Sequence, residues 1–323
     1  MKLGDIKKIG VGGAGTMGAG IAQIFALKGY EVVVTDIAEK FLDNAKRIIE
    51  INNSSLIDEK IIAPEDVEKT AQNISFTTDI EVFSDVDVII EAIVEKLDIK
   101  QNYWKEVEKI AREDAIFATN TSGLSITEIC KKVEKKNRFV GMHWWNPPHI
   151  ILLIEIIRGK ETDDETVDVL LELVKKIDRE PVIVQKDVNG FIGNRLQFAL
   201  FREALNIVEQ GIASAEDVDK AIKYGPGFRY ASIGPLETAD LAGLDIFYDI
   251  SSYLWNEISD AKEPSEMLTK LVEEGNLGVK SGKGFYDYSD GKGEEAMRRR
   301  DKAFYKTLRE LHMKTLKDDL FAN

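Results

Sequence analysis

Two residues that handle protons, a histidine and a glutamate, frame the stretch GMHWWNPPHIILLIE at residues 141–155. GMHWW and LLIEII can pair as an antiparallel hairpin about a turn centred near His149. His143 and Glu155 then lie opposite each other, because the residue numbers of directly paired positions in a hairpin add up to the same total. A carboxylate beside an imidazole fixes its tautomer and favours the protonated ring, which suits proton transfer. The stretch therefore predicts a His143–Glu155 pair. On this stretch alone, a core histidine and a glutamate on an exposed strand edge is an open alternative.

A second group of residues suits a dinucleotide. The turn GVGGAGTMGAG has G-x-G-x-x-G spacing between a predicted strand and a predicted helix, where backbone N–H groups meet a pyrophosphate. Asp36 ends the next strand, where its carboxylate can accept hydrogen bonds from the adenosine ribose and repel a 2′-phosphate. NAD is therefore expected rather than NADP. The predicted contacts of the turn are Gly13, Gly15, Thr16, Met17 and Gly18.

Together the two groups predict a dehydrogenase. Oxidation of an alcohol with NAD removes a hydride and a proton from one carbinol, and a histidine is the usual proton acceptor. A flexible glycine turn without a nucleotide is the alternative for the first group, and the position of Asp36 argues against it.

The elements that must position these residues follow from hydrophobic patterning. Short β-branched runs alternate with helical patterns through the first half, which is typical of a parallel sheet wrapped by helices. Two capping-box pairs, Ser125 with Glu128 and Thr162 with Glu165, predict helix starts. Strands are expected at IKKIGVGG, YEVVVTD, NISFTT, VDVIIEAI, AIFATN, RFVGMHW, LLIEII and EPVIV.

The pattern changes after Asp187, where strand-like runs largely stop and the long apolar helix FIGNRLQFALFREALNIVEQG follows. Ser214 is expected to cap the next helix. The fold class predicted is α/β, with a Rossmann-type, doubly wound, mostly parallel sheet over residues 1–187 and an all-α domain over residues 188–323. The long helix is apolar on several sides, so a second subunit or the other domain should cover it.

Composition excludes several classes of protein. The sequence contains no run of 18 or more apolar residues, so no membrane span is predicted. The charged start MKLGDIKKIGVGG is interpreted as the residues that lead into a strand rather than as a signal peptide. A cytoplasmic protein is therefore expected. A net charge of −14 disfavours binding to nucleic acid or to an anionic membrane. The lone Cys130 lies in an apolar helical pattern, so neither a disulfide nor a metal site is expected.

Several segments, in order over nearly the whole chain, resemble the 3-hydroxyacyl-CoA dehydrogenase family: GAGTMGAGIA, EAIVEKLDIK, NTSGLSI, GMHWWNP, DVNGFIGNR, GPLETADLAGLD and SGKGFYDY. The resemblance implies that His143 is the general base and Glu155 its orienting carboxylate. It also implies that Ser122 and Asn194 hold the reacting oxygen and carbonyl, and that the helical domain forms a homodimer. The contacts implied around the nicotinamide and ribose are Glu95, Lys100, Asn146 and Lys280. Taken singly, each of these could be an ordinary loop hydroxyl, helix-surface amide or solvated charge.

The departures from the family pattern concern the substrate. The chain has WWNPPHII where the family usually has FFNPVPVM, Gly123 follows Ser122 in place of a second serine, and Asn189 replaces a proline. The stretch AKRIIEINNSSLIDEKI is poor in lysines that would meet coenzyme A phosphates. In addition, GPGFRYASIGPLE and AMRRRDKAFYKTLREL resemble the gulonate and carnitine dehydrogenase branch, in which Arg229 could pair with a free carboxylate. Arg229 could equally bridge subunits or satisfy helix carbonyls.

The predicted function is NAD-dependent oxidation of a 3-hydroxyacyl-CoA, such as 3-hydroxybutyryl-CoA, or the reverse reaction. One alternative is a dehydrogenase of a small free 3-hydroxy acid held by Arg229. A more remote alternative is a non-catalytic NAD-binding protein, against which the joint presence of Ser122, His143, Glu155 and Asn194 argues.

Overall fold

The computed structural model describes residues 1–312, which fall into two compact units that meet in sequence between Asn194 and Arg195. The boundary predicted from the sequence lies at residues 187 and 188. No helix among the described residues is long and apolar enough to cross a membrane.

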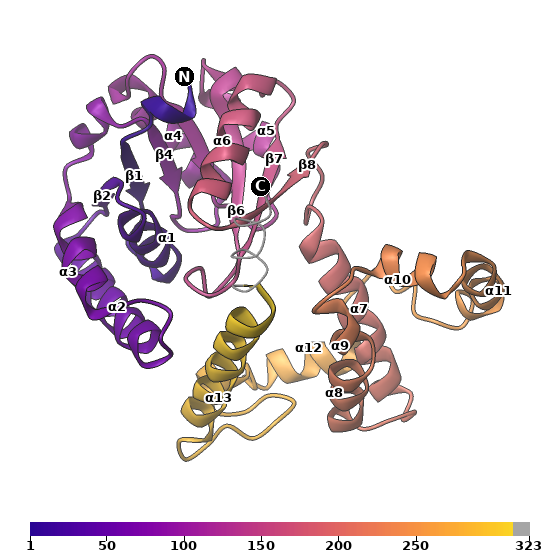
Figure 1. The fold of residues 1–323 in the computed structure, drawn as a ribbon. Helices are drawn as coiled ribbons and strands as arrows, with labels where there is room; N and C mark the ends of the chain where they lie inside the picture. Colours follow the sequence, from indigo (N-terminus) through magenta and orange to yellow (C-terminus); the bar gives the residue numbers. More distant parts are fainter. Residues whose placement is uncertain (313–323) are drawn as a thin grey trace. The chain divides into compact units, whose positions relative to one another are not determined.

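The first unit is built on an eight-stranded sheet in the order β3-β2-β1-β4-β5-β6-β7-β8 (Figure 1). Neighbouring strands are parallel except β6 and β7, which are antiparallel. This confirms the predicted Rossmann-type, mostly parallel sheet. The strands are β1 (Lys8–Gly12), β2 (Glu31–Thr35), β3 (Ile74–Thr77), β4 (Val88–Glu91), β5 (Ile116–Thr119), β6 (Phe139–Trp144), β7 (Leu153–Arg158) and β8 (Glu180–Val184).

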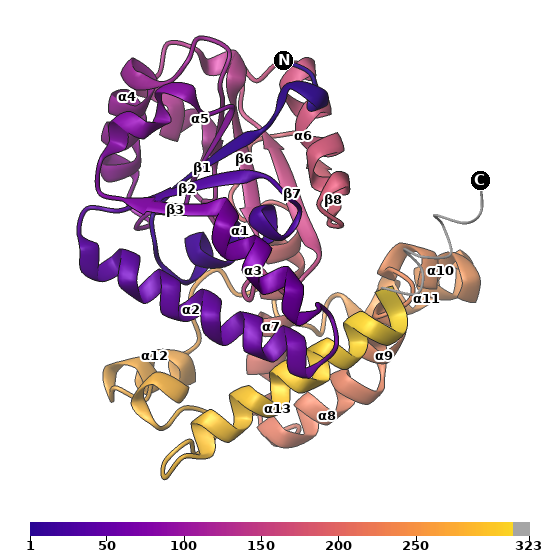
Figure 2. The same cartoon turned by 60° about the vertical axis from the view of Figure 1, so that its left-hand side comes forward.

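Helices cover both faces of the sheet, so its central strands are apolar at nearly every position. One core contains the buried sides of α1, α2 and α6, and the other contains those of α4 and α5. Figure 2 shows α2 and α3 beside α1. The helices are α1 (Thr16–Leu27), α2 (Glu39–Asp58), α3 (Pro64–Asn73), α4 (Leu97–Ile110), α5 (Ile126–Ile129) and α6 (Asp164–Lys176), with short 3₁₀ turns at Leu3–Asp5, Ile80–Asp85, Cys130–Lys132 and Lys136–Arg138.

The hairpin of β6 and β7 has the predicted register. His143 pairs with Glu155, flanked by the pairs of Met142 with Ile156 and Trp144 with Ile154. Because side chains alternate along a strand, His143 and Glu155 lie on the same face of the sheet.

Two predicted helix starts have different outcomes. Ser125 caps α5 and accepts a hydrogen bond from the Glu128 N–H, as expected, although α5 continues for only four residues before a 3₁₀ turn. The predicted start of α6 at Thr162 is wrong by one residue. Asp163 is the N-cap and accepts from the Thr166 N–H, because the Thr162 hydroxyl instead donates to the Phe139 carbonyl.

The regular elements of the second unit, up to His312, are helical, which confirms the predicted all-α region. Its first helix, α7, begins just before the division between the units, and Ser214 caps α8 as predicted. The elements are α7 (Gly193–Glu209), α8 (Ala215–Tyr224), α9 (Pro226–Tyr230), α10 (Pro235–Ala242), α11 (Leu244–Leu254), α12 (Glu266–Glu273), a 3₁₀ turn at Val279–Ser281, α13 (Lys292–Thr307) and a π-helical turn at Leu308–His312.

Candidate active site

A buried histidine and a buried carboxylate are joined at the β6–β7 hairpin. The Nδ1 of His143 lies 2.7 Å from Oε2 of Glu155. The exposed fractions of the two residues are 4% and 0%. A carboxylate can only accept, so Nδ1 carries the proton and Nε2 of the neutral ring is left with its lone pair.

The second oxygen of Glu155 is held by the backbone that leads into α7. Oε1 accepts hydrogen bonds from the N–H groups of Ile192 at 2.9 Å and Gly193 at 3.0 Å. Burial by itself raises the pKa of Glu155, but the hydrogen bonds from His143, Gly193 and Ile192 outweigh it and hold that pKa below its usual value. Glu155 is therefore an ionised, oriented carboxylate. The sequence analysis did not identify the two N–H donors, because they are close to Glu155 only in the folded chain.

Aromatic rings surround the imidazole. The ring centroid of Trp145 lies 5.4 Å and that of Phe191 5.6 Å from His143. The indole of Trp145 also packs where a side chain at Gly193 would stand, since a Cβ there would lie 2.3 Å from its Cζ2. These contacts hold the imidazole plane in an apolar setting, where proton transfer and charge interactions are poorly screened by water.

Ser122 and Asn194, which the sequence placed at the same site, are in contact. The Nδ2 of Asn194 donates to the backbone carbonyl of Ser122 at 2.9 Å, and the Ser122 N–H donates to Oε1 of Glu95 at 2.9 Å. The Ser122 residue itself is exposed. The loop after β5 therefore lies against the start of α7, with the Ser122 hydroxyl free of these backbone contacts.

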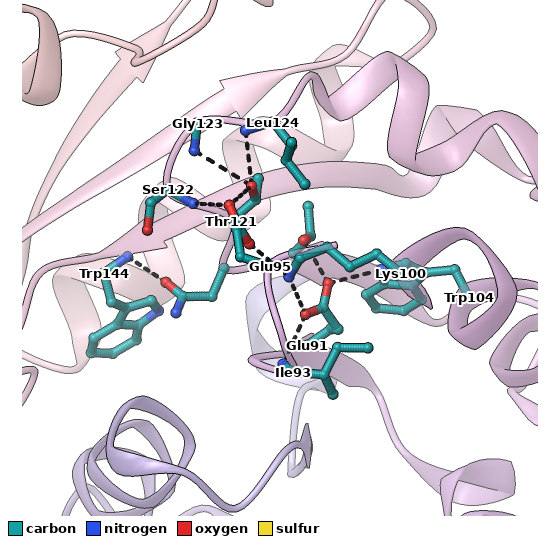
Figure 3. A network of polar contacts seen from close by, with 12 residues as sticks. Glu91, Ile93, Glu95, Lys100, Trp104, Thr121, Ser122, Gly123, Leu124 and Trp144 are labelled. Carbon is teal, nitrogen blue, oxygen red and sulfur yellow. Dashed lines mark hydrogen bonds and ion pairs between the residues drawn. The ribbon is translucent and has the colours of Figure 1, made fainter. Parts of the chain in front are cut away.

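A buried network of charges supports this loop from below (Figure 3). Lys100, which is fully buried, places its Nζ 2.5 Å from Oε1 of Glu91 and 3.2 Å from Oε2 of Glu95. Glu95 also accepts from the Thr121 hydroxyl, and Glu91 accepts from the Thr119 hydroxyl. Glu95 and Lys100 thus belong to one network of ion pairs and hydrogen bonds. Their contact with the dinucleotide stays a prediction.

Glu91 was missed by the sequence analysis, although one signal was available. It is an acidic residue that ends the apolar strand β4 directly before the loop carrying Glu95. A buried carboxylate at such a position requires a cationic partner, and Lys100 supplies it.

Asp187, in the segment that precedes α7, binds the end of the loop that follows β5. Its carboxylate accepts hydrogen bonds from the Ser125 hydroxyl at 2.6 Å, the Thr127 N–H at 2.8 Å and the Ile126 N–H at 3.1 Å. The first N–H groups of a helix have no intrahelical acceptor, so Asp187 caps α5 from a distant part of the chain.

The glycine turn fits a dinucleotide. Gly13 has a φ of +103°, and a Cβ on it would lie 2.6 Å from the Ala92 carbonyl oxygen. A Cβ on Gly18 would lie 1.8 Å from the Gly13 carbonyl oxygen, so the backbone of α1 packs directly against the backbone of the glycine turn. By contrast, a Cβ on Gly15 would meet nothing within 4 Å, which leaves open space at the N-terminus of α1. This space, with the uncapped N–H groups of Thr16, Met17 and Gly18 beside it, suits a pyrophosphate.

Asp36 stands beside this turn at the end of β2. One carboxylate oxygen accepts from the Ala14 N–H at 2.7 Å and the other from the Ile37 N–H at 2.7 Å. Each oxygen has a further lone pair, so the oriented carboxylate can still receive ribose hydroxyls.

Three other predicted residues are exposed. Asn146 lies in the turn of the hairpin, where its peptide bond to Pro147 is cis. Arg229 on α9 and Lys280 in the turn Val279–Ser281 belong to the second unit, and their substrate and cofactor contacts stay predictions.

Family comparison agrees with this geometry. Residues 8–188 match the model of the 3-hydroxyacyl-CoA dehydrogenase NAD binding domain, and residues 190–288 match that of the C-terminal domain of the same family. The chain belongs to the 3-hydroxyacyl-CoA dehydrogenase family. It is therefore an NAD-dependent oxidoreductase of a family that acts on CH–OH groups, and NAD is its cofactor.

Individual relatives within the family differ in substrate. The chain is 36% identical to 5-formyl-3-hydroxy-2-methylpyridine 4-carboxylate 5-dehydrogenase of Mesorhizobium japonicum, over 88% of this chain and 91% of the relative. It is 39% identical to a probable 3-hydroxybutyryl-CoA dehydrogenase of Deinococcus radiodurans, over 87% of this chain and 100% of the relative. A solved structure of a 5-formyl-3-hydroxy-2-methylpyridine 4-carboxylic acid 5-dehydrogenase, described as an NAD⁺-dependent dismutase, matches with a TM-score of 0.89 and 34% identity, over 95% of this chain and 98% of that one.

Proposed function

We propose that the protein oxidises the 3-hydroxy group of a 3-hydroxyacyl-CoA, such as 3-hydroxybutyryl-CoA, to the 3-oxo group, or catalyses the reverse reaction. The observation that carries the proposal is the buried pair of His143 and Glu155, joined at 2.7 Å within a family whose members include 3-hydroxybutyryl-CoA dehydrogenases.

In this reaction His143 is the general base. With Nδ1 directed to Glu155, Nε2 is the nitrogen that accepts the proton of the substrate hydroxyl. The ionised Glu155 stabilises the imidazolium that results, and the N–H groups of Ile192 and Gly193 keep the carboxylate in place. When bound, NAD supplies the hydride acceptor for the carbinol carbon.

Ser122 and Asn194 position the substrate oxygen. Asn194 uses one N–H on the Ser122 carbonyl, which leaves its second N–H and the Ser122 hydroxyl as donors. Such preorganised donors stabilise the charge that develops on the reacting oxygen.

Replacing the base tests this assignment. In His143→Ala, turnover should fall by roughly a hundredfold or more, the usual scale for loss of a positioned general base, while the Kd for NADH stays close to that of the wild type. His149→Ala, at the second histidine of the hairpin, is the matched control and should retain turnover. Unchanged turnover in His143→Ala would refute the role of this residue, whatever the substrate.

A small free acid is the second candidate substrate, and two observations favour it. Trp145 places an indole beside His143, which narrows the space next to the imidazole. A relative with high structural similarity has a substrate named as a pyridine carboxylate, without coenzyme A. Arg229, which is exposed and makes no side-chain hydrogen bond or ion pair with the described residues, would hold the carboxylate.

A substrate panel separates the two candidates. NADH production is measured on 3-hydroxyacyl-CoA thioesters of increasing chain length and, in parallel, on 3-hydroxybutyrate, gulonate and carnitine. Arg229→Lys is then assayed on one thioester and one free acid. Selective loss on the free acid supports the second candidate, because lysine cannot form the bidentate pair of arginine with a carboxylate. Activity on thioesters alone, unchanged in Arg229→Lys, supports the first. A protein that binds NADH but turns over neither class would be the non-catalytic alternative.

We also propose that the protein forms a homodimer through its second unit. In that unit the helix α7 exposes Leu196 and Phe198 by 59% and 60%, and α10 and α11 add Leu236, Leu241 and Tyr248. Exposed apolar patches of this kind mark protein–protein interfaces.

A further inference from the structure

Two carboxylates share one buried ammonium group at the end of β4. The Nζ of Lys100 lies 2.5 Å from Oε1 of Glu91 and 3.2 Å from Oε2 of Glu95 (Figure 3). These three side chains, here called the charged cluster, bring two negative charges against one positive charge. One carboxylate would be enough to neutralise Lys100. The second requires an explanation, because placing charge in the interior of a protein is costly.

The two carboxylates differ in their exposure to solvent. Glu91 is fully buried, and besides Lys100 its oxygens accept from the Ile93 N–H at 2.9 Å and the Thr119 hydroxyl at 2.7 Å. The side chain of Glu95 is 43% exposed, and its other donors belong to the loop after β5. Glu91 is therefore the buried counter-ion of Lys100. The surplus negative charge of the cluster belongs to Glu95, whose carboxylate reaches solvent.

The order of the strands indicates which half of a dinucleotide faces this charge. The order reverses between β1 and β4, and a dinucleotide binds across the carboxyl ends of the strands at such a point. Asp36 at the end of β2 is expected to hold the adenosine ribose, and the glycine turn after β1 the pyrophosphate. The nicotinamide half then extends over the end of β4, which Glu91 terminates and Glu95 follows.

The two redox forms of the cofactor differ in charge at this half. The nicotinamide ring of NAD⁺ is a cation, whereas that of NADH is neutral. A net negative charge beside the ring therefore stabilises bound NAD⁺ more than bound NADH, and in a partly buried site it is only weakly screened by water.

We propose that Glu91 neutralises Lys100 so that the charge of Glu95 stays uncompensated and favours the binding of NAD⁺ relative to NADH. Glu91 is then a positioning residue that acts through Lys100 and Glu95 without touching the cofactor. The proposal rests on the binding of NAD and is independent of the substrate proposed above.

Three variants of the full-length protein change the charge of the cluster in a defined way. Glu91→Gln and Glu95→Gln each leave one carboxylate for Lys100, so the cluster becomes neutral. In the double variant Glu91→Gln with Lys100→Met, the buried ion pair is lost as a unit. Glu95 then carries the same net charge as the wild-type cluster, and no buried ammonium is left without its buried counter-ion.

Asp87→Asn provides a matched control on the same strand. Asp87 is also buried, accepts from the N–H groups of Lys7 and Lys8 at 2.7 and 2.9 Å, and pairs with Arg112. It directly precedes β4, however, so it lies at the opposite edge of the sheet from Glu91. This variant removes a buried carboxylate from an ion pair and leaves the charged cluster intact.

The experiment measures the Kd of NAD⁺ and the Kd of NADH for each variant by titration calorimetry, and the ratio of the two is compared. The adenosine and pyrophosphate groups are common to both ligands, so their contributions cancel in the ratio. In Glu91→Gln and Glu95→Gln, the ratio of the Kd of NAD⁺ to that of NADH should rise by roughly fivefold, the order expected for one unit charge acting within a partly buried site. In the double variant and in Asp87→Asn, the ratio should stay close to that of the wild type.

The double variant separates charge from folding. If Glu91 had only a structural role, loss of both its side-chain charge and that of Lys100 would have no reason to restore the ratio. If Glu91→Gln does not fold, Glu95→Gln and the double variant still give opposite results, a raised ratio and a wild-type ratio.

Two results would overturn the proposal. An unchanged ratio in Glu95→Gln, or in folded Glu91→Gln, would mean that the net charge of the cluster does not act on the nicotinamide. A raised ratio in the double variant would mean that Glu91 acts otherwise than by neutralising Lys100. Both readouts are binding constants measured without turnover, so failure of the proposed reaction is distinguishable from failure of this proposal.

Discussion

Glu155 shows how a single carboxylate serves both the fold and the chemistry. Its oxygens accept three hydrogen bonds, from the His143 ring and from the N–H groups of Ile192 and Gly193. Two of these donors are backbone, so the carboxylate stays oriented whether or not the imidazole is charged. The charge itself, rather than the shape of the side chain, is what favours the imidazolium.

Glu155→Gln removes the charge and keeps the shape of the side chain. If the amide oxygen accepts from His143, the imidazolium loses its counter-charge and the amide NH2 faces the N–H groups of Ile192 and Gly193, which lose their acceptor. We expect kcat for oxidation to fall by roughly tenfold or more, the lower end of the range for impaired general-base catalysis. The acidic limb of the kcat/KM profile should move to lower pH, because the protonated ring is less favoured. A profile that superimposes on that of the wild type would contradict the pairing in catalysis.

The same variant tests the acid stability of the fold. The pKa of Glu155 is lowered in the folded chain, so its ionised form contributes stability that is fully present above the ordinary value of 4.5 and is lost as the pH falls through the lowered value. The difference in unfolding free energy between wild type and Glu155→Gln should therefore be larger at neutral pH than in acid. Urea denaturation at the two pH values measures it, and equal differences would exclude this linkage.

At the scale of elements, Asp187 links the loop after β5 to the segment that leads into α7. Because Ser122 lies on that loop and Asn194 at the start of that helix, the link brings together the two proposed oxygen-positioning residues. In Asp187→Ala, we expect the unfolding free energy to fall by about 1–3 kcal/mol, the scale for hydrogen bonds to a charged group, together with a fall in kcat. Guanidinium denaturation and steady-state kinetics measure the two effects.

Asp163→Ala is the control for this prediction. Asp163 is the N-cap of α6 and accepts from the Thr166 N–H, much as Asp187 accepts from the first N–H groups of α5, but none of the proposed site residues lies on α6. This variant should lose about 1 kcal/mol of stability, as for other N-caps, with kcat unchanged. If Asp187→Ala also leaves kcat unchanged, the link has a role in stability only.

Elements with strong local patterns were predictable from the sequence. Seven of the eight strands lie within the predicted runs, and β7 extends one residue beyond its run, to Arg158; the pairing of His143 with Glu155 follows from the hairpin arithmetic. The start of α6 was missed by one residue because Thr162 and Asp163 can both cap a helix. Which of them does so depends on a distant acceptor, the Phe139 carbonyl, that local sequence does not show.

The residues that hold the site in place could not be predicted from the sequence, because their partners are also distant in the chain. Glu91 and Asp187 act through contacts with residues from other strands and helices. Their types alone are common at strand ends and on helices. The parallel pairing of β4 with β5, together with α4, brings Lys100 and the Thr119 hydroxyl to Glu91.

At the scale of the whole molecule, the two units differ in how much core they contain. The two apolar clusters of the first unit are buried on both faces of the sheet. In the second unit few described apolar side chains are buried, and many on α7, α10 and α11 are exposed. A helical unit of this size requires further burial to be stable, which a second copy can supply.

We therefore expect the protein to sediment as a homodimer at micromolar concentration, at about twice its chain mass of 36.3 kDa. Leu241→Asp, on the exposed side of α10, should shift the equilibrium to monomer, because an ionised carboxylate in an apolar interface is costly to desolvate. Ile51→Asp is the matched control, since Ile51 is equally an exposed apolar residue of a helix, α2, but belongs to the first unit. Analytical ultracentrifugation over a dilution series distinguishes the outcomes. A wild type that is monomeric throughout, or a control that dissociates as readily as Leu241→Asp, would show that these helices are not the interface.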